Sequence, residues 1–104
     1  MSYIYKHVEV VRVVNGDTVD AQIDLGFGIK TDQRLQLLDC NAPEEGQPGY
    51  EEASNKLQQL LAAGPITLQT TKMDGFRRWL SYLSVDSADV NATMAAWLKE
   101  ASFQ

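Results

Sequence analysis

The sequence predicts a small, mainly β (α+β) domain: a closed barrel of five short strands, with one helix after the third strand and another at the C-terminal end. The first forty-odd residues are typical of strands, with apolar and polar residues alternating at period 2 in residues 19–24, and residues 66–72 alternate again. Gly, Pro, Asn and Asp cluster between these stretches and mark turns. An open five-stranded sheet would expose two edges, which a closed barrel hides. The length of 104 residues is that of one domain, so residues 1–104 are assigned to a single domain.

The first two strands are expected in residues 8–14 and 19–24, joined as a hairpin. Valines dominate the first strand, and Asn15-Gly16 follows it, a dipeptide suited to a tight turn because both residues tolerate positive φ. In the second strand, every other residue is apolar, as expected for one buried face: Val19, Ala21 and Ile23. Residues 25–28 contain two glycines and are expected to break this strand.

The third strand is expected over residues 29–38, with Arg34 and Gln36 on the same polar face. Residues 41–49 contain two prolines and two glycines, which predicts a loop. A helix is then expected over residues 50–63, because apolar residues recur at helical spacing and Gly64 with Pro65 supplies a stop.

The C-terminal third is expected to form two strands and a helix. Residues 66–72 alternate again, Asp74-Gly75 is a turn, and residues 79–85 form the fifth strand, which ends at the turn-forming residues 86–89. Asn91 is the expected N-cap of the last helix. Its apolar residues fall at helical spacing: Met94, Trp97, Leu98 and Ala101.

Composition narrows the classes of function. Nine Lys and Arg against fourteen Asp and Glu give a net charge of −5, the opposite of the basic footprint of a protein that binds nucleic acid by bulk charge. The single cysteine, Cys40, excludes an intramolecular disulfide and is expected to be a buried apolar side chain. No signal-peptide pattern and no membrane-spanning apolar run is present, so the expected location is the cytoplasm, with no membrane partner.

Three polar clusters lie in the breaks between the expected elements: residues 15–18, 41–44 and 74–78. A barrel could bring the carboxylates of Asp17 and Glu44 to one rim, where they and neighbouring carbonyl or amide oxygens would suit a hard cation such as Ca²⁺. Arg78 could bind a phosphate through its guanidinium fork. Together these groups are typical of phosphodiester hydrolysis, although each cluster alone is more often a plain turn or loop.

In their order and spacing, residues 15–19, 34–44, 74–82 and 90–91 resemble the staphylococcal nuclease (thermonuclease) family, and the resemblance extends from about Val8 to Ala101. It implies a five-stranded OB-fold barrel and Ca²⁺-dependent hydrolysis of DNA or RNA phosphodiester bonds. Asp17 matches the family's first calcium-ligand aspartate, and the Ala42 backbone carbonyl is implied as a further ligand. Glu44 matches the glutamate associated with the attacking water, and Arg78 matches the second catalytic arginine.

Two positions depart from the family's pattern. In an ungapped alignment ending at Pro43-Glu44, the first catalytic arginine falls on Gln36 and the second calcium-ligand aspartate falls on Asn41. Gln36 can donate a hydrogen bond but brings no charge, and losing one preorganised donor to a developing oxyanion typically lowers the rate by about 100- to 1000-fold. Asn41 can offer a carbonyl oxygen but no negative charge, which predicts weak or absent Ca²⁺ binding.

An alternative alignment restores both residues. Arg34 and Asp39 stand five positions apart, as the family's arginine and aspartate do, so a two-residue insertion before Ala42 would bring them into register. Arg34 also shares a strand face with Gln36, so its long side chain could reach the site without such a shift.

The chain is also shorter at its C-terminal end than members of this family generally are, and the last helix carries Trp97 and Phe103 on an apolar face. Self-association or a protein partner at this helix is one hypothesis. Two functions therefore remain open. One is a weakened nuclease acting through Asp17, Glu44 and Arg78, and the other is an inactive OB-fold module that binds nucleic acid or a protein partner.

Overall fold

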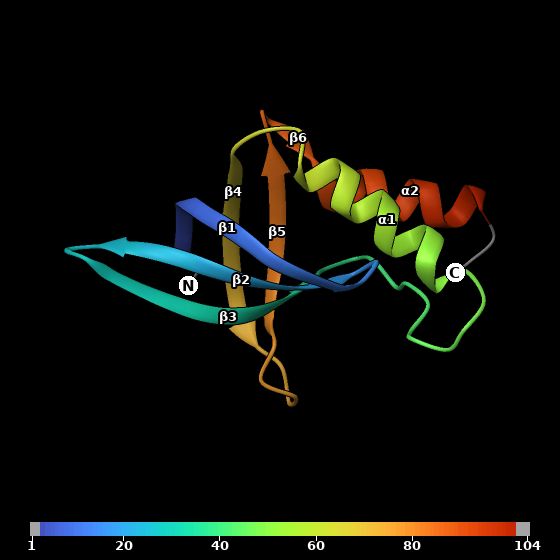
Figure 1. The fold of residues 1–104 in the computed structure, drawn as a ribbon, viewed down its shortest axis with the longest axis horizontal. Coiled ribbons are helices and arrows are strands. Elements are labelled where there is room, and N and C mark those ends of the chain that lie inside the picture. Colours follow the sequence, from blue (N-terminus) through green and yellow to red (C-terminus); the bar gives the residue numbers. More distant parts are fainter. Residues whose placement is uncertain (1–2, 102–104) are drawn as a thin grey trace.

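The computed structural model describes residues 3–101. Within them the chain forms six strands and two helices (Figure 1). The first half holds β1 (Tyr3–Asn15), β2 (Thr18–Gly26), β3 (Ile29–Leu37) and α1 (Tyr50–Leu61). The second half holds β4 (Ile66–Met73), β5 (Trp79–Val85), the two-residue β6 (Ala88–Asp89) and α2 (Val90–Glu100). The predicted order of elements is confirmed, and β6 is an addition that the turn-rich residues 86–89 did not reveal.

The strands form a closed barrel. Their order in the sheet is β3-β2-β1-β4-β5-β6, and β3 also pairs with β5 in parallel, with Leu35 opposite Trp79 and Leu37 opposite Ser81. This pairing joins two strands far apart in the sheet and covers their edges. The five-stranded OB-fold barrel is thereby confirmed. No helix within residues 3–101 is long and apolar enough to cross a membrane.

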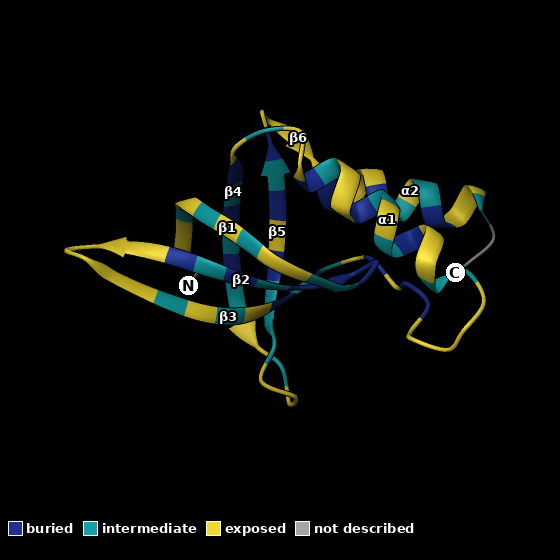
Figure 2. Ribbon diagram, viewed as in Figure 1, coloured by how far each residue is buried: buried dark blue, intermediate teal, exposed yellow. Residues whose placement is uncertain are grey.

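The core lies inside the barrel and beneath the two helices, which lie together on one side of it (Figures 1 and 2). Alternate residues of the strands point inward, as the period-2 pattern predicted. From the strands come Val19, Leu35, Leu37, Leu68 and Leu83, and from the helices Ala53, Leu57, Met94 and Leu98. The helices therefore cover one end of the barrel and leave the other end free of helical cover.

The β1–β2 turn differs from the one expected. Asn15 pairs with Thr18, so the two turn residues are Gly16 and Asp17 rather than Asn15 and Gly16. Neither Asn15 nor Gly16 has positive φ. Glycine is needed here for space, because a Cβ added to Gly16 would lie 2.7 Å from the Cβ of Ala53 in α1 and 2.8 Å from the Cβ of Ala42. The hairpin prediction is confirmed, but its physical reason was wrong.

The β2–β3 turn is shorter than the expected break over residues 25–28. Leu25 and Gly26 still belong to β2, and the turn consists of Phe27 and Gly28, with φ of 57° and 75°. Phe27 is fully exposed at the tip. The hairpin therefore extends two residues further from the barrel than the glycine pattern suggested.

The N-cap of α2 is Asp89, not Asn91, since the Asp89 side chain accepts a hydrogen bond from the backbone N–H of Ala92. Asn91 is instead buried in the first turn of the helix. Its Nδ2 donates to the carbonyl oxygens of Leu38 and Ser81, and its Oδ1 accepts from the N–H of Leu83. The side chain thus ties α2 to β5 and to the end of β3.

Two further expectations concern single side chains. Cys40 is buried, as expected, and burial raises the pKa of its thiol to about 12, helped by the nearby carboxylates of Asp17, Asp39 and Asp89. Trp97 is partly buried and packs against the core. Phe103, the other residue of the expected apolar face, lies outside the described residues.

Candidate functional site: two loops and an arginine-bearing sheet face

Asp17 lies in the β1–β2 turn and is almost fully buried, with 4% of its surface exposed. Its Oδ2 accepts from the backbone N–H of Ala42 at 2.9 Å, and its Oδ1 accepts from the hydroxyl of Thr18 at 2.8 Å. Its backbone carbonyl accepts from the N–H of Leu37 at 2.7 Å. Asp17 therefore joins the first turn directly to the end of β3 and the loop that follows it.

The loop after β3 presents Glu44 to solvent next to this buried contact. Ala42 and Pro43 are buried, whereas Glu44 is exposed. The backbone N–H of Glu44 donates to Oε1 of Gln47, and the N–H of Gln47 donates back to the Glu44 carbonyl at 2.9 Å. This reciprocal pair fixes the backbone of Glu44 and leaves its carboxylate out of both bonds.

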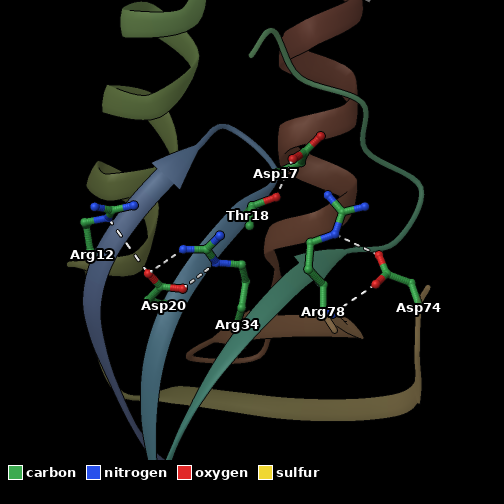
Figure 3. Close-up of polar contacts among 7 residues, drawn as sticks. All are labelled: Arg12, Asp17, Thr18, Asp20, Arg34, Asp74 and Arg78. Atoms are coloured by element: carbon green, nitrogen blue, oxygen red, sulfur yellow. Dashed lines mark hydrogen bonds and ion pairs between the residues drawn. The ribbon is translucent and has the colours of Figure 1, made fainter. Parts of the chain in front are cut away.

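Arg78 stands at the start of β5 and is held by Asp74 from the β4–β5 loop (Figure 3). Its Nε lies 2.7 Å from Oδ2 of Asp74, whose Oδ1 accepts from the backbone N–H groups of Phe76 and Arg78. Burial raises the pKa of Asp74, but these two N–H groups and the Arg78 guanidinium outweigh it and lower the pKa below its ordinary value. The guanidinium carbon also lies 5.4 Å from the centre of the Phe76 ring.

Arg34 is held by Asp20, its direct partner across β2 and β3. Its Nε lies 2.7 Å from Oδ1 of Asp20 and its Nη2 lies 3.1 Å from Oδ2, and Arg12 on β1 approaches the same carboxylate at 3.8 Å. The hydrogen bond from Arg34 is the main cause of the lowered pKa of Asp20, and Asp20 in turn raises the pKa of Arg34.

The remaining predicted positions are spread around the end of β3. Gln36 is half-buried and pairs with Thr18, next to Asp17 in the chain. Asn41 is exposed, and Asp39 is exposed with a φ of 63°. The hydroxyl of Tyr82 on β5 lies 3.4 Å from Oδ2 of Asp39. Within residues 3–101, no three His, Cys, Asp or Glu side chains gather closely enough to hold a metal ion.

In this arrangement a buried carboxylate and an exposed one come from two joined loops, and guanidinium groups stand on the neighbouring sheet face. Figure 3 shows Arg12, Arg34 and Arg78 in one row, with Asp20 and Asp74 between and beside them. Three cationic groups thus face two carboxylates in this row, which leaves a local excess of one positive charge on a protein whose net charge is −5. Such a row can hold an anionic phosphate at the sheet surface.

Four residues contribute to this site in ways that the sequence did not indicate: Arg12, Asp20, Asp74 and Asn91. Nothing local singles out Arg12 or Asp20 among the polar residues of the strands, although counting the register back from the β2–β3 turn places Asp20 opposite Arg34. Asp74 belongs to one of the three predicted polar clusters but had no predicted role beside its turn, and the signal for its contact with Arg78 is its place four residues earlier. Asn91 joins α2 to the end of β3 by contacts for which no local signal exists.

Comparisons with known proteins agree with the fold. No family model matches the chain. The chain is 28% identical over 99 residues to an uncharacterized endonuclease of Escherichia coli O157:H7, covering 90% of this chain and 61% of that protein. It is 31% identical over 78 residues to Protein ParB of Escherichia coli, covering 75% of this chain and 41% of that protein. It is 31% identical over 72 residues to a micrococcal nuclease of Shigella flexneri, covering 69% of this chain and 38% of that protein.

The chain thus spans between 38% and 61% of the length of these three relatives. The relatives with nuclease names align over most of this chain, and the observed barrel has its helix after the third strand. The predicted resemblance to the staphylococcal nuclease family is thereby confirmed, at 28–31% identity to relatives named endonuclease and micrococcal nuclease.

Proposed function

We propose that this chain carries a weakened nuclease site that hydrolyses DNA or RNA phosphodiester bonds, with Asp17, Glu44 and Arg78 as its functional side chains. The main observation in its favour is the 2.9 Å hydrogen bond from the Ala42 N–H to Asp17, because it couples the turn that carries Asp17 to the loop that carries Glu44. The nuclease names of the relatives support the same class of reaction.

Each side chain has a role that follows from its surroundings. The exposed Glu44 carboxylate is free to orient or deprotonate a water molecule as general base. Arg78 uses Nε to bind Asp74 and keeps its terminal N–H groups for a phosphate oxygen, where they stabilise the charge that develops in the transition state. Asp74 fixes the direction of that guanidinium, as a preorganised site requires.

Calcium belongs to this proposal as a weakly held ion. The oxygens available around the first turn are those of Asp17, the Asn41 side chain and the Ala42 carbonyl, which is the donor chemistry that Ca²⁺ prefers. A carboxylate has about four acceptor positions, and Asp17 uses two of them for Thr18 and Ala42, so it can still serve as a ligand. Asn41 adds no formal charge, and a bound ion would neutralise phosphate charge. We therefore expect low affinity.

The rate is expected to be low for a second reason. Gln36 occupies the position that pairs with Thr18, and Arg34, the alternative cation on β3, is bound by both oxygens of Asp20. The site therefore relies on one guanidinium, that of Arg78, which predicts a rate about 100- to 1000-fold below that of a site with two.

A second candidate function has an observation of its own. Both carboxylate oxygens of Asp17 accept hydrogen bonds from the protein itself, and its burial is that of a structural contact between two loops. This arrangement favours a module that has kept the fold, and binds nucleic acid or a protein partner, without hydrolysis.

Cleavage of single-stranded DNA and RNA, with Ca²⁺ and with a chelator, distinguishes the two candidates. Glu44→Gln should abolish cleavage, whereas Glu45→Gln, which changes the neighbouring exposed glutamate, should leave it unchanged. The double variant Gln36→Arg/Asn41→Asp should raise the rate and the dependence on Ca²⁺. Equal cleavage by the wild type and Glu44→Gln contradicts the catalytic assignment, and an inert wild type beside an active double variant favours the binding module.

A further inference from the structure

A cavity of about 190 Å³ opens inside the barrel at the end away from the helices. Its lining includes none of the three proposed functional side chains, Asp17, Glu44 and Arg78. Its walls come from all five strands of the barrel. Figure 1 shows the start of β1, which forms one side of this end, on the opposite side of the barrel from α1 and α2. Among its lining residues are three aromatic side chains: Tyr3, Tyr5 and Trp79.

The cavity is built from cross-strand pairs whose members both face inward. Tyr3 pairs with Thr70 and Tyr5 with Leu68 across β1 and β4. Leu35 pairs with Trp79 across the parallel junction of β3 and β5. Because these contacts come from ladder register, the walls are preformed and do not depend on a mobile loop.

The chemistry of the lining suits a flat heteroaromatic ring. Tyr3 and Tyr5 lie two residues apart on one face of β1, and Trp79 faces them from the strand that closes the barrel. The polar lining includes Gln33, whose Nε2 donates to the hydroxyl of Thr31 at 2.8 Å, so that its carboxamide is held while its Oε1 can accept from a ligand. A volume of 190 Å³ is below the roughly 300–1,000 Å³ of pockets for drug-sized ligands and matches a single ring system.

The cavity also adjoins the row of arginines. Leu35 and Trp79 line the cavity, and each directly follows an arginine, Arg34 and Arg78 respectively. Successive residues of a strand point to opposite sides, so the Arg34 guanidinium lies on the outer face of the wall whose inner face Leu35 forms. An anionic group attached to a ring in the cavity would therefore meet positive charge where it passes over the rim to this outer face.

We propose that this cavity binds a nucleobase of a single-stranded nucleic acid, with its phosphates at the Arg34 and Arg78 side of the rim. The ligand class rests on the proposed function, whereas the cavity itself does not. Double-stranded substrates would be disfavoured, because a paired and stacked base cannot enter an enclosed ring-sized cavity without being flipped out.

Fluorescence anisotropy of a labelled, short single-stranded oligodeoxyadenylate, measured in chelator so that nothing is cleaved, tests this proposal. Tyr3→Ala should weaken binding roughly five- to 150-fold, the effect of losing one stacking surface. Tyr3→Phe should keep it. Ile4→Ala is the matched control, because Ile4 is 63% exposed against 55% for Tyr3, neighbours it in the chain and does not line the cavity. Both positions are exposed, so folding should survive in all three variants, which circular dichroism verifies.

An oligonucleotide of the same length with abasic sites, which keeps the phosphates, should bind much more weakly than the oligodeoxyadenylate. Equal affinity for the two probes, or equal binding by wild type and Tyr3→Ala, overturns the proposal. Glu45→Gln, which changes an exposed glutamate outside the proposed catalytic set, should bind the oligodeoxyadenylate as the wild type does. Failure of the nuclease proposal would then appear in the cleavage assay alone, and failure of the nucleobase site in this binding assay alone.

Discussion

Asp17 and Asp74 each lie in the connection that follows a strand, but their carboxylates make different kinds of contact. Asp17 is buried and accepts from the N–H of Ala42, which lies 25 residues away in the chain. Asp74 makes only local bonds, to the backbone of Phe76 and Arg78 and to the Arg78 guanidinium. The first turn therefore holds the barrel to the loop that follows β3, and the β4–β5 loop holds one half-buried side chain in place. A turn motif alone does not reveal which of these two roles it has.

Gly16 in the β1–β2 turn should tolerate substitution by alanine less well than Gly75 in the β4–β5 loop. Gly16→Ala should lower the free energy of unfolding by about 1–3 kcal/mol, because its new Cβ would overlap the Cβ atoms of Ala53 and Ala42. The matched variant Gly75→Ala in the β4–β5 loop meets nothing within 4 Å and should change stability by about 0.5 kcal/mol or less. Urea denaturation measures both, and similar losses in the two variants would remove the contrast between the turns.

The Asp17 carboxylate should matter to stability by itself. In Asp17→Asn the amide oxygen can keep the bond from the Ala42 N–H, and the new NH₂ group can donate to the Thr18 hydroxyl, which also accepts. Both contacts survive without the negative charge, and the loss of two charge-assisted bonds should cost about 0.5–1.5 kcal/mol. Asp24→Asn is the control, because Asp24 is exposed and accepts from the nearby Gly26 N–H. Thermal denaturation of the two variants at neutral pH should separate them, and an unchanged melting temperature in Asp17→Asn would show that this charge is dispensable.

The smallest effect is expected at the exposed arginine row, and it depends on pH. The pKa of Asp20 is lowered in the folded state, chiefly by the hydrogen bond from Arg34, so its stabilising contribution is present above the unfolded aspartate pKa of about 4. That contribution is lost as the pH falls from there through the lowered folded pKa. Asp20→Asn should cost about 0–1 kcal/mol at pH 7, as exposed ion pairs do, and nothing below both pKa values. Urea denaturation at a series of pH values tests this, and a cost that persists in strong acid would assign it to packing.

Much of the fold could be predicted from local pattern. The alternation of Val19, Ala21 and Ile23 and the helical spacing of Ala53 and Leu57 identified buried faces that the structure confirms. The closure of the barrel was predicted from the need to cover sheet edges, and the parallel pairing of β3 with β5 confirms it. The N-cap of α2 was placed two residues late, because Asp89 and Asn91 are both good caps and only the start of the hydrogen-bonded turn distinguishes them.

The candidate site was less accessible to prediction. The sequence singled out Asp17, Glu44 and Arg78, and their roles stay predictions. It did not indicate that Arg34 is engaged by Asp20, because that contact follows from the register of the β2–β3 hairpin. It also did not predict the cavity at the end of the barrel away from the helices, because the residues that line it are spread along the chain from position 3 to position 79.

The difference between what the sequence predicted and what only the tertiary structure determined has a physical origin. Periodicity, turn-forming residues and helix stops act over a few neighbouring positions, so the chain alone was enough to set the order and type of its elements and its likeness to a nuclease family. Long-range geometry was needed for the rest. Gly16 is small because Ala53 and Ala42 lie against it, and Asp17 is buried because Ala42 donates to it. Leu35 and Trp79 share a cavity wall because β3 closes on β5, and each of these contacts exists only once distant segments have packed.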